Sequence, residues 1–300
     1  MREFEYNGTV YRPPMEATTF LLPVTEGCTH NACRFCNMYK GVPFKILDID
    51  RISEYMEEAA AFYHKYNRKM DRVYLVGADP FALNADKLKV VTDVVYKYAP
   101  ECKVITMYAA VRNIMSKSDE ELARIKEMGI NDLYVGVEST LNDVLSYLNK
   151  GNSADDAKEQ LLRLNKAGIR HMDMMMTGAA GKGRGKESGI SAARFFKETK
   201  PFMIIYTTMS VFPGTELEKD VENGKFIPAR EKEILTEEKV ILENLDLPDT
   251  YFWAAHSLDS VRLQDYLTKE NRGKMIDTLD NAINTLDEDK FEKVFKRTSL

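Results

Sequence analysis

Apolar runs rich in β-branched residues alternate with charged, amphipathic segments along most of the chain. Six of these runs have the length and composition of strands, at 19–25, 72–78, 102–109, 132–138, 170–178 and 202–212. Segments between them repeat apolar residues at helical spacing, over 50–67, 84–98, 116–128, 153–167 and 187–199. Strands that are apolar on both faces and alternate with helices predict a parallel sheet covered by helices.

Capping residues support the ends of several predicted helices. Ser118 precedes an acidic first turn and Ser153 precedes another helical segment, as N-capping residues do. Gly129 and Gly168 stand where two of the helical patterns end, which is typical of helix C-termini. The number and even spacing of the strand–helix units favour a barrel or partial barrel over an open doubly wound sheet.

The chain beyond residue 215 has a different pattern. A helix is predicted over 230–245, a strand over 250–257 and a second helix over 268–286. We interpret residues 1–215 as a core barrel and residues 216–300 as an extension packed on it. The expected fold is therefore α/β, a partial (β/α)6 TIM-type barrel with a C-terminal α/β extension.

Composition and charge narrow the range of partners. The chain is 44% apolar and 30% charged, which allows a core of ordinary size, and its formal net charge is -5. An acidic balance gives no general attraction for nucleic acid or for an anionic membrane, so neither is expected as a partner. The first residues contain no apolar signal segment, and no stretch approaches membrane-spanning length. We therefore expect a cytoplasmic, reducing environment.

Three of the four cysteines lie within nine positions, directly after the first predicted strand. Cys28, Cys33 and Cys36 have the spacing C-x4-C-x2-C, and in a reducing compartment such a cluster indicates metal binding. A structural zinc site would need His30 as its fourth ligand. A [2Fe–2S] centre would need Cys102, which is distant in the chain. Three thiolates alone suit a [4Fe–4S] cluster with one iron left open for an exchangeable ligand, which is the interpretation that we favour.

The run "CTHNACRFC", with Phe35 just before the last cysteine, resembles the cysteine loop of the radical SAM superfamily. The usual spacing in that family is C-x3-C-x2-C, and this chain has one more residue in the first gap. The resemblance extends over about residues 11–260. It is carried also by the stretches "YRPPMEATTFLLPVTEGCTHNACRFCNMYKGVPFK", "LYVGVESTLNDVLSYLNKG" and "VFPGTELEKDVENGKF".

This resemblance implies an oxidoreductase-type or lyase-type enzyme with two cofactors, a [4Fe–4S] cluster on Cys28, Cys33 and Cys36 and S-adenosylmethionine (SAM) on the open iron. A reduced cluster would cleave SAM to a 5′-deoxyadenosyl radical that abstracts hydrogen from a small-molecule substrate. The implied electron donor is a flavodoxin or a ferredoxin.

The resemblance also implies a set of cofactor-binding residues at the ends of the strands. The turn Gly77–Pro80 stands where the family has a GGEP-type stretch that binds the methionine ammonium, although a turn at a strand end would use the same residues. Glu138 ends a strand, and a carboxylate there needs a partner, either the cofactor or a salt bridge. The full set is Phe35, Gly77, Ala78, Asp79, Pro80, Glu138, Ser139 and Lys150.

Five further residues are candidates for substrate contact. Tyr108 and Arg112 lie at the end of the third predicted strand, where they could line the substrate cavity. Lys182 and Arg184 lie in a glycine-rich loop that matches neither common phosphate-loop pattern and could equally be a solvated loop. His256 comes after "TYFWAA", near the end of the strand predicted over 250–257, and could instead be a structural histidine.

Two other functions compete with this interpretation. A zinc-stabilised binding protein without catalysis would explain the cysteines alone. An RNA-modifying radical SAM enzyme would share the cofactors, but the acidic balance of the chain disfavours it.

Overall fold

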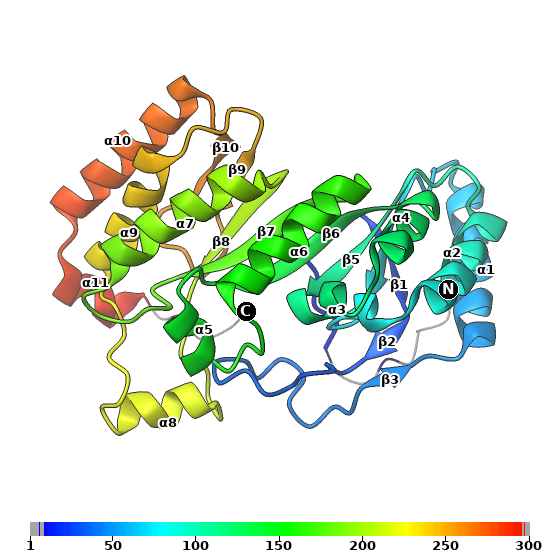
Figure 1. Cartoon of the computed structure of the whole chain (residues 1–300), viewed down its shortest axis with the longest axis horizontal. Helices are drawn as coiled ribbons and strands as arrows, with labels where there is room; N and C mark the ends of the chain where they lie inside the picture. The colour runs from blue at the N-terminus through cyan, green and yellow to red at the C-terminus, as the bar shows by residue number, and fades with distance from the viewer. Residues whose placement is uncertain (1–5, 7–8, 296, 298–300) are drawn as a thin grey trace. The chain divides into compact units, whose positions relative to one another are not determined.

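The computed structural model describes Tyr6, residues 9–295 and Arg297 (Figure 1). The strands are β1 (Phe20–Pro23), β2 (Thr25–Glu26), β3 (Lys45–Ile46), β4 (Arg72–Val76), β5 (Val104–Ala110), β6 (Ile130–Glu138), β7 (Arg170–Thr177), β8 (Met203–Thr208), β9 (Tyr251–Ala254) and β10 (Leu263–Tyr266). The helices are α1 (Ile49–Lys65), α2 (Ala85–Tyr98), α3 (Val111–Met115), α4 (Asp119–Glu127), α5 (Asn142–Tyr147), α6 (Ala154–Ala167), α7 (Gly185–Thr199), α8 (Glu216–Glu222), α9 (Glu231–Asn244), α10 (Lys269–Thr285) and α11 (Glu288–Val294), with 3-10 turns η1 (Pro14–Glu16) and η2 (Pro80–Ala82).

The chain forms two compact units. The first contains the described residues up to Asn31 together with Met38–Gly136 and Gln160–His171. The second contains Ala32–Asn37, Val137–Glu159 and the described residues from Met172 onward. The cysteine loop therefore passes from the first unit to the second between its first and second cysteines.

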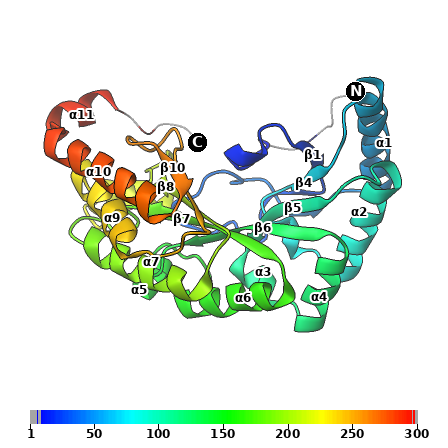
Figure 2. The ribbon, with the colours of Figure 1, turned by 90° about the horizontal axis from the view of Figure 1, so that it is seen from above.

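In the first unit the strands follow the order β1-β4-β5-β6 and run parallel. Tyr74 of β4 pairs with Leu21 on one side and with Thr106 on the other, so these three residues lie level across the sheet. Figure 2 shows α1, α2 and α4 outside these strands. The helices cover a nearly continuous apolar face, and Leu75 and Leu88 within it have no exposed surface.

In the second unit β7, β8 and β9 run parallel, and β10 closes the order as an antiparallel neighbour of β9. The helices α7 and α9 pack closely because α7 presents two glycines to α9. A Cβ atom on Gly189 would lie 2.9 Å from the carbonyl oxygen of Glu237, and one on Gly185 would lie 3.1 Å from that of Glu233. Only glycine permits this separation of the two helix backbones.

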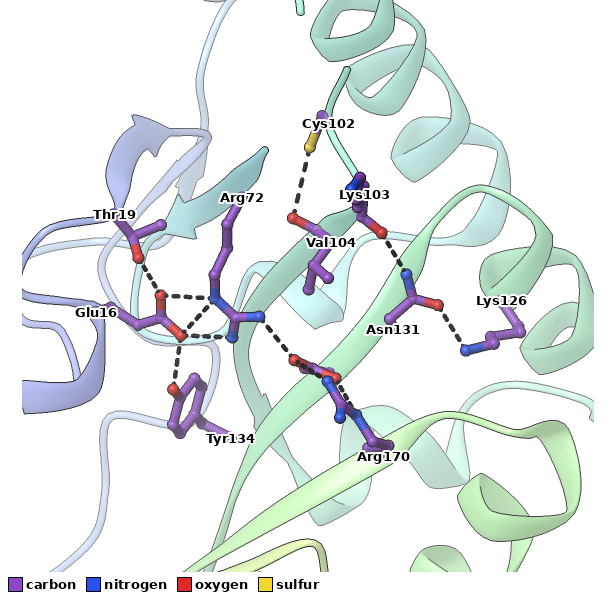
Figure 3. Close-up of polar contacts among 11 residues, drawn as sticks. Glu16, Thr19, Arg72, Cys102, Lys103, Val104, Lys126, Asn131, Tyr134 and Arg170 are labelled. Carbon is purple, nitrogen blue, oxygen red and sulfur yellow. Dashed lines mark hydrogen bonds and ion pairs between the residues drawn. The ribbon is translucent and has the colours of Figure 1, made fainter. Parts of the chain in front are cut away.

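An ion-pair network lies at the amino-terminal ends of the strands in the first unit's sheet (Figure 3). Arg72 donates to both carboxylate oxygens of Glu16, at 3.1 and 3.0 Å, and pairs with Asp132 at 2.8 Å. Arg170 also pairs with Asp132 at 2.8 Å, and the Tyr134 hydroxyl donates to Glu16 at 2.6 Å. Burial alone would raise the pKa of Glu16, but the Arg72, Thr19 and Tyr134 hydrogen bonds lower it overall. These charges therefore stabilise the fold at the ends where the strands begin, whereas active sites of such folds generally lie at the opposite, carboxyl-terminal ends.

The predicted elements agree with the structure to within a few residues, with informative exceptions. Ser118 caps α4 through a full capping box, as expected. The helix predicted over 116–128 is preceded by a separate short helix, α3, because Ser116 ends α3 and Ser118 starts α4. The pattern missed the short helices α5, α8 and α11 and the short strands β3 and β10. No helix in the described part of the chain combines the length and apolar character needed to cross a bilayer.

Candidate functional site

The first cysteine lies on a tight turn in the first unit. Gly27 has φ of 66°, and a Cβ atom there would lie 2.5 Å from the carbonyl oxygen of Pro43, so only glycine fits. The Sγ atom of Cys28 accepts a hydrogen bond from the Asn31 amide at 3.4 Å, and the Asn31 side chain donates to the carbonyl of Tyr39 at 2.9 Å. These two contacts fix the position of the Cys28 sulfur on the turn.

Asp79 anchors this turn. Its carboxylate accepts both the amide of Thr29, at 3.4 Å, and the Thr29 hydroxyl. Arg112 and Asn113, at the start of α3, each donate to the same carboxylate at 3.2 Å. Arg112 also donates to the Thr29 hydroxyl at 2.9 Å. The residue after Cys28 is thereby tied to the end of β4 and to α3, and the Asp79 side chain is fully engaged.

The turn after β4 depends on Gly77. This residue has φ of 149°, and a Cβ atom would collide with the Thr25 hydroxyl and lie 2.8 Å from the Thr25 carbonyl oxygen. Thr25 belongs to β2, directly before the cysteine turn. The close approach of the two backbones therefore requires glycine at this position. Pro80 follows as the first residue of η2.

Two predicted substrate residues have structural partners in the first unit. The Tyr108 ring packs edge-on against Tyr74 at 5.7 Å and against Tyr134 at 6.2 Å between centroids. Burial raises the pKa of Tyr74 well above its ordinary value, so this hydroxyl stays protonated. Arg112, as described above, pairs with Asp79.

The second and third cysteines lie in the second unit, on a segment that several hydrogen bonds hold in place. The carbonyl of Ala32 accepts from the Asn149 side chain at 2.8 Å. Arg34 donates its amide to the carbonyl of Leu148 at 3.0 Å. The amide of Cys36 donates to the carbonyl of Cys33 at 3.3 Å and closes a turn. The first two contacts come from Leu148 and Asn149, which directly precede the predicted cofactor-binding residue Lys150.

Phe35 packs into a small hydrophobic cluster of the second unit. The buried members are Val144, Leu148, Met176 and Ala179. The aromatic ring beside the third cysteine is thus fixed by apolar contacts with α5 and the end of β7.

Glu138 and Lys150 form an ion pair at the end of β6. Their nearest atoms are 2.8 Å apart, and both side chains are less than 15% exposed. Burial would lower the pKa of Lys150, but Glu138 and negative charge on the sulfur atoms of Cys33 and Cys36 raise it overall. Glu138 adopts φ of 68°, a left-handed conformation that costs about 1 kcal/mol or more for a residue other than glycine. Such strain is common at functional sites.

Ser139 and His256 serve their own loops. The Ser139 hydroxyl accepts from the Leu141 amide at 3.2 Å. His256 accepts from the Leu258 amide through Nδ1 at 3.2 Å, and burial lowers its pKa. Its amide donates to Asp259 at 2.9 Å. The neutral imidazole therefore orders a turn after β9.

The basic residues of the glycine-rich loop differ in their surroundings. Arg184 pairs with Asp143 at 2.5 Å and with Glu187 at 2.8 Å, and these acids hold it at the start of α7. Lys182 is exposed, and its amide donates to the carbonyl of Ile227 at 2.8 Å. Lys182 presents the more accessible of the two cations.

Cys102 differs from the other cysteines. It is buried directly before β5, at the end of the sheet where the parallel strands begin, and donates to the Val104 carbonyl at 3.5 Å (Figure 3). Burial raises the pKa of this thiol to about 11, so it stays protonated at neutral pH. All four cysteines lie in the described residues and carry thiols. Among those residues, no three His, Cys, Asp or Glu side chains are already gathered as a metal site.

An α/β fold with a parallel sheet and a cysteine loop after its first strand defines the class of this protein. Residues 22–180 match the radical SAM superfamily, which is just over half of the chain. The chain belongs to this superfamily, whose members are enzymes. A search of curated proteins by sequence gave no match.

Several solved structures share the fold at low sequence identity. Elp3 from Methanocaldococcus infernus has a TM-score of 0.56 at 14% identity, covering 88% of this chain and 63% of its own. Methylornithine synthase has a TM-score of 0.56 at 16% identity, covering 87% and 68%. The radical SAM methyltransferase TsrM from Kitasatospora setae has a TM-score of 0.53 at 14% identity, covering 69% of this chain and 39% of its own. The predicted α/β fold class and the family are confirmed.

The named activities of these neighbours differ from one another, and this chain spans only 39% of the length of TsrM. At these identities the likeness concerns the fold alone. The reaction of this protein therefore has to be argued from its own residues.

Proposed function

We propose that this protein is a radical SAM enzyme that abstracts hydrogen from a small molecule. The observation that supports this most is the family match over residues 22–180, which contains all three clustered cysteines. Cys28, Cys33 and Cys36 would hold the [4Fe–4S] cluster. Their chemistry fits it, because they are thiols on an anchored loop, with an amide donor at Cys28 and the cation of Lys150 near Cys33 and Cys36.

When bound, the cluster and SAM supply the electron transfer and the 5′-deoxyadenosyl radical that removes hydrogen from the substrate. Lys150 compensates negative charge on the thiolates beside it, and Glu138 is the candidate carboxylate for the ribose or ammonium of SAM. Because its carboxylate already accepts four hydrogen bonds, Asp79 leaves only backbone groups of the Gly77–Pro80 turn to bind SAM.

The net charge of -5 supports a small-molecule substrate over a polyanion such as RNA. Tyr108, Lys182 and His256 remain proposed substrate contacts. A flavodoxin or ferredoxin as electron donor and a cytoplasmic location also remain proposals.

The test is product analysis under anaerobic conditions. Protein reconstituted with iron and sulfide and reduced with dithionite is expected to convert SAM slowly to 5′-deoxyadenosine and methionine. Cys33→Ala should lose both iron and activity, whereas Cys102→Ala is the matched cysteine control and should keep both.

Three results would contradict the proposal. Formation of methylthioadenosine or S-adenosylhomocysteine alone would indicate another SAM chemistry. Bound zinc without turnover would indicate the binding protein. Loss of iron from Cys102→Ala but not from Cys33→Ala would show that the ligand assignment is wrong.

A further inference from the structure

Arg34, between the second and third cysteines, joins the ends of two helices. Its amide donates to the carbonyl of Leu148 at 3.0 Å, where α5 ends. Its carbonyl accepts from the amide of Leu217 at 2.9 Å, in the first turn of α8. The last carbonyls and the first amides of a helix have no hydrogen-bond partner within the helix. Arg34 supplies one to each of these two helix ends. The backbone between Cys33 and Cys36 is thus fixed by α5 and α8 together.

The side chain of Arg34 contacts the same two helices. Its guanidinium pairs with the carboxylate of Asp220 on α8. It also lies over the Tyr147 ring of α5, 5.3 Å from the centroid. The Tyr147 hydroxyl donates to Asp220 at 2.8 Å, so the carboxylate accepts hydrogen bonds from both Arg34 and Tyr147. The Tyr147 ring also stacks nearly parallel on the ring of Phe226, with 5.6 Å between the centroids.

The charges of this cluster are constant around neutral pH. Hydrogen bonds from Tyr147 and Arg34 lower the pKa of Asp220, and Asp220 raises the pKa of Arg34. Burial and the Asp220 carboxylate raise the pKa of Tyr147 to about 12. The carboxylate is only 7% exposed, whereas Arg34 is 32% exposed. Water therefore competes for the hydrogen bonds of the Arg34 guanidinium but hardly reaches the Asp220 carboxylate. Asp220 is the more firmly held of the two side chains.

We propose that Asp220 and Tyr147 are positioning residues for the cluster-binding loop. They act through Arg34, which they hold from both sides, and so set the turn from Cys33 to Cys36. This inference rests on the proposed function, since it assumes that these cysteines bind a cluster. It assigns a role to α8, which follows residue 215, in the cysteine site itself.

The test compares Asp220→Asn with Glu216→Gln in reconstituted, anaerobic protein. Asp220→Asn keeps the shape of the side chain but leaves the Arg34 cation without its anion. Glu216→Gln removes an ion pair with Lys219 at 2.8 Å on the same helix, where both side chains are more than half exposed. The readouts are the rate at which a ferrous chelator bleaches the cluster and the EPR signal of the reduced protein with and without SAM.

We expect chelation of Asp220→Asn to be about five- to tenfold faster than wild type, which is typical of the loss of a close, partly buried charge pair. Its EPR signal should broaden, because the Cys33–Cys36 turn then takes more than one arrangement. Glu216→Gln should match wild type. Tyr147→Phe, which removes one hydrogen bond and keeps the ring, should increase the chelation rate less than Asp220→Asn does. Asp220→Glu, which keeps the charge, should also chelate more slowly than Asp220→Asn.

A double variant separates positioning from general destabilisation. Arg34→Met should accelerate chelation, and adding Asp220→Asn to it should add little, because both act through one contact. If Asp220→Asn does not fold, Tyr147→Phe and Arg34→Met carry the same comparison with Glu216→Gln.

Two outcomes would overturn the inference, and they differ from each other. A wild-type protein that binds a cluster, with Asp220→Asn and Tyr147→Phe both equal to Glu216→Gln, would show that these residues do not position the loop, while the proposed function stands. A wild-type protein that binds no iron would refute the proposed function and the inference together.

Discussion

Replacement of Asp79 by asparagine should loosen the turn that carries Cys28. The carboxylate accepts from the Thr29 amide at 3.4 Å, from the Thr29 hydroxyl, and from Arg112 and Asn113 at 3.2 Å each. Asparagine has the same shape, but it is uncharged and one of its two polar atoms donates. The asparagine oxygen can still accept hydrogen bonds, but it carries no charge. Its NH2 group then faces at least one of the N–H or O–H donors that the carboxylate had bound.

The cost follows from the number and burial of the contacts. A hydrogen bond to a charged group contributes about 1.5–3 kcal/mol and a neutral one about 1 kcal/mol. The carboxylate is buried, but Arg112 is 25% exposed, so solvent screens its share. We expect Asp79→Asn to lower the free energy of unfolding by about 2–4 kcal/mol. This is less than the usual stability of a domain, so the variant should still fold.

Two measurements check this expectation. Urea unfolding of the iron-free protein gives the change in free energy. Peptide mapping after a short pulse of iodoacetamide gives the labelling rate of each cysteine, and Cys28 should be labelled faster in Asp79→Asn. Asp86→Asn is the matched control, because Asp86 also pairs with an arginine, Arg124 at 2.7 Å, but its side chain is 79% exposed. Equal unfolding and equal Cys28 labelling in Asp79→Asn and Asp86→Asn would refute the role of Asp79.

Three shorter predictions follow from other contacts. Gly77→Ala should lose about 2–4 kcal/mol of stability in urea unfolding, because its Cβ atom collides with Thr25 at a φ that disfavours alanine; an unchanged midpoint would contradict this. Burial raises the pKa of Glu237 to about 7 from 4.5. Folding therefore favours its protonated form, and stability should fall as pH rises from about 4.5 through 7. Between pH 5 and 8 the free energy of unfolding of Glu237→Gln should fall by about 3 kcal/mol less than that of the wild type. Cys102→Ala should leave the iron content unchanged, and loss of iron would contradict the assigned ligands.

The pattern of apolar residues predicted most of the fold because long elements carry strong periodicity. The strands from β4 to β8 and the helices α1, α2, α6, α7, α9 and α10 lie within a few residues of their predicted bounds. The helices α5 and α8 have six and seven residues, too few for periodicity to stand out. They form because tertiary contacts hold them, as the hydrogen bonds of Arg34 to both show.

The sequence indicated the cysteine ligands but not the residues that hold them. Clustered cysteines are visible as spacing, and their chemistry restricts the possible metals. The partners are not visible, because Asp79 lies 50 residues from Thr29 and Asp220 lies 186 residues from Arg34. Asp79 was predicted for its backbone turn, and only the structure shows its carboxylate on Thr29. Asp220 lies in "ELEKDVENGKF", a stretch singled out by its resemblance without an expected role for any residue.

The two anchors hold the backbone beside the cysteines and leave the sulfur atoms to other partners. In the first unit a buried acid binds Thr29, directly after Cys28, and in the second a buried acid binds Arg34, directly after Cys33. Asp79 lies in the turn between β4 and η2 of the first unit, and Asp220 lies in α8 of the second. The geometry of the loop therefore depends on the folding of both units rather than on the loop sequence. An extra residue between Cys28 and Cys33 is compatible with such a loop, because each half is held independently of the spacer that joins them.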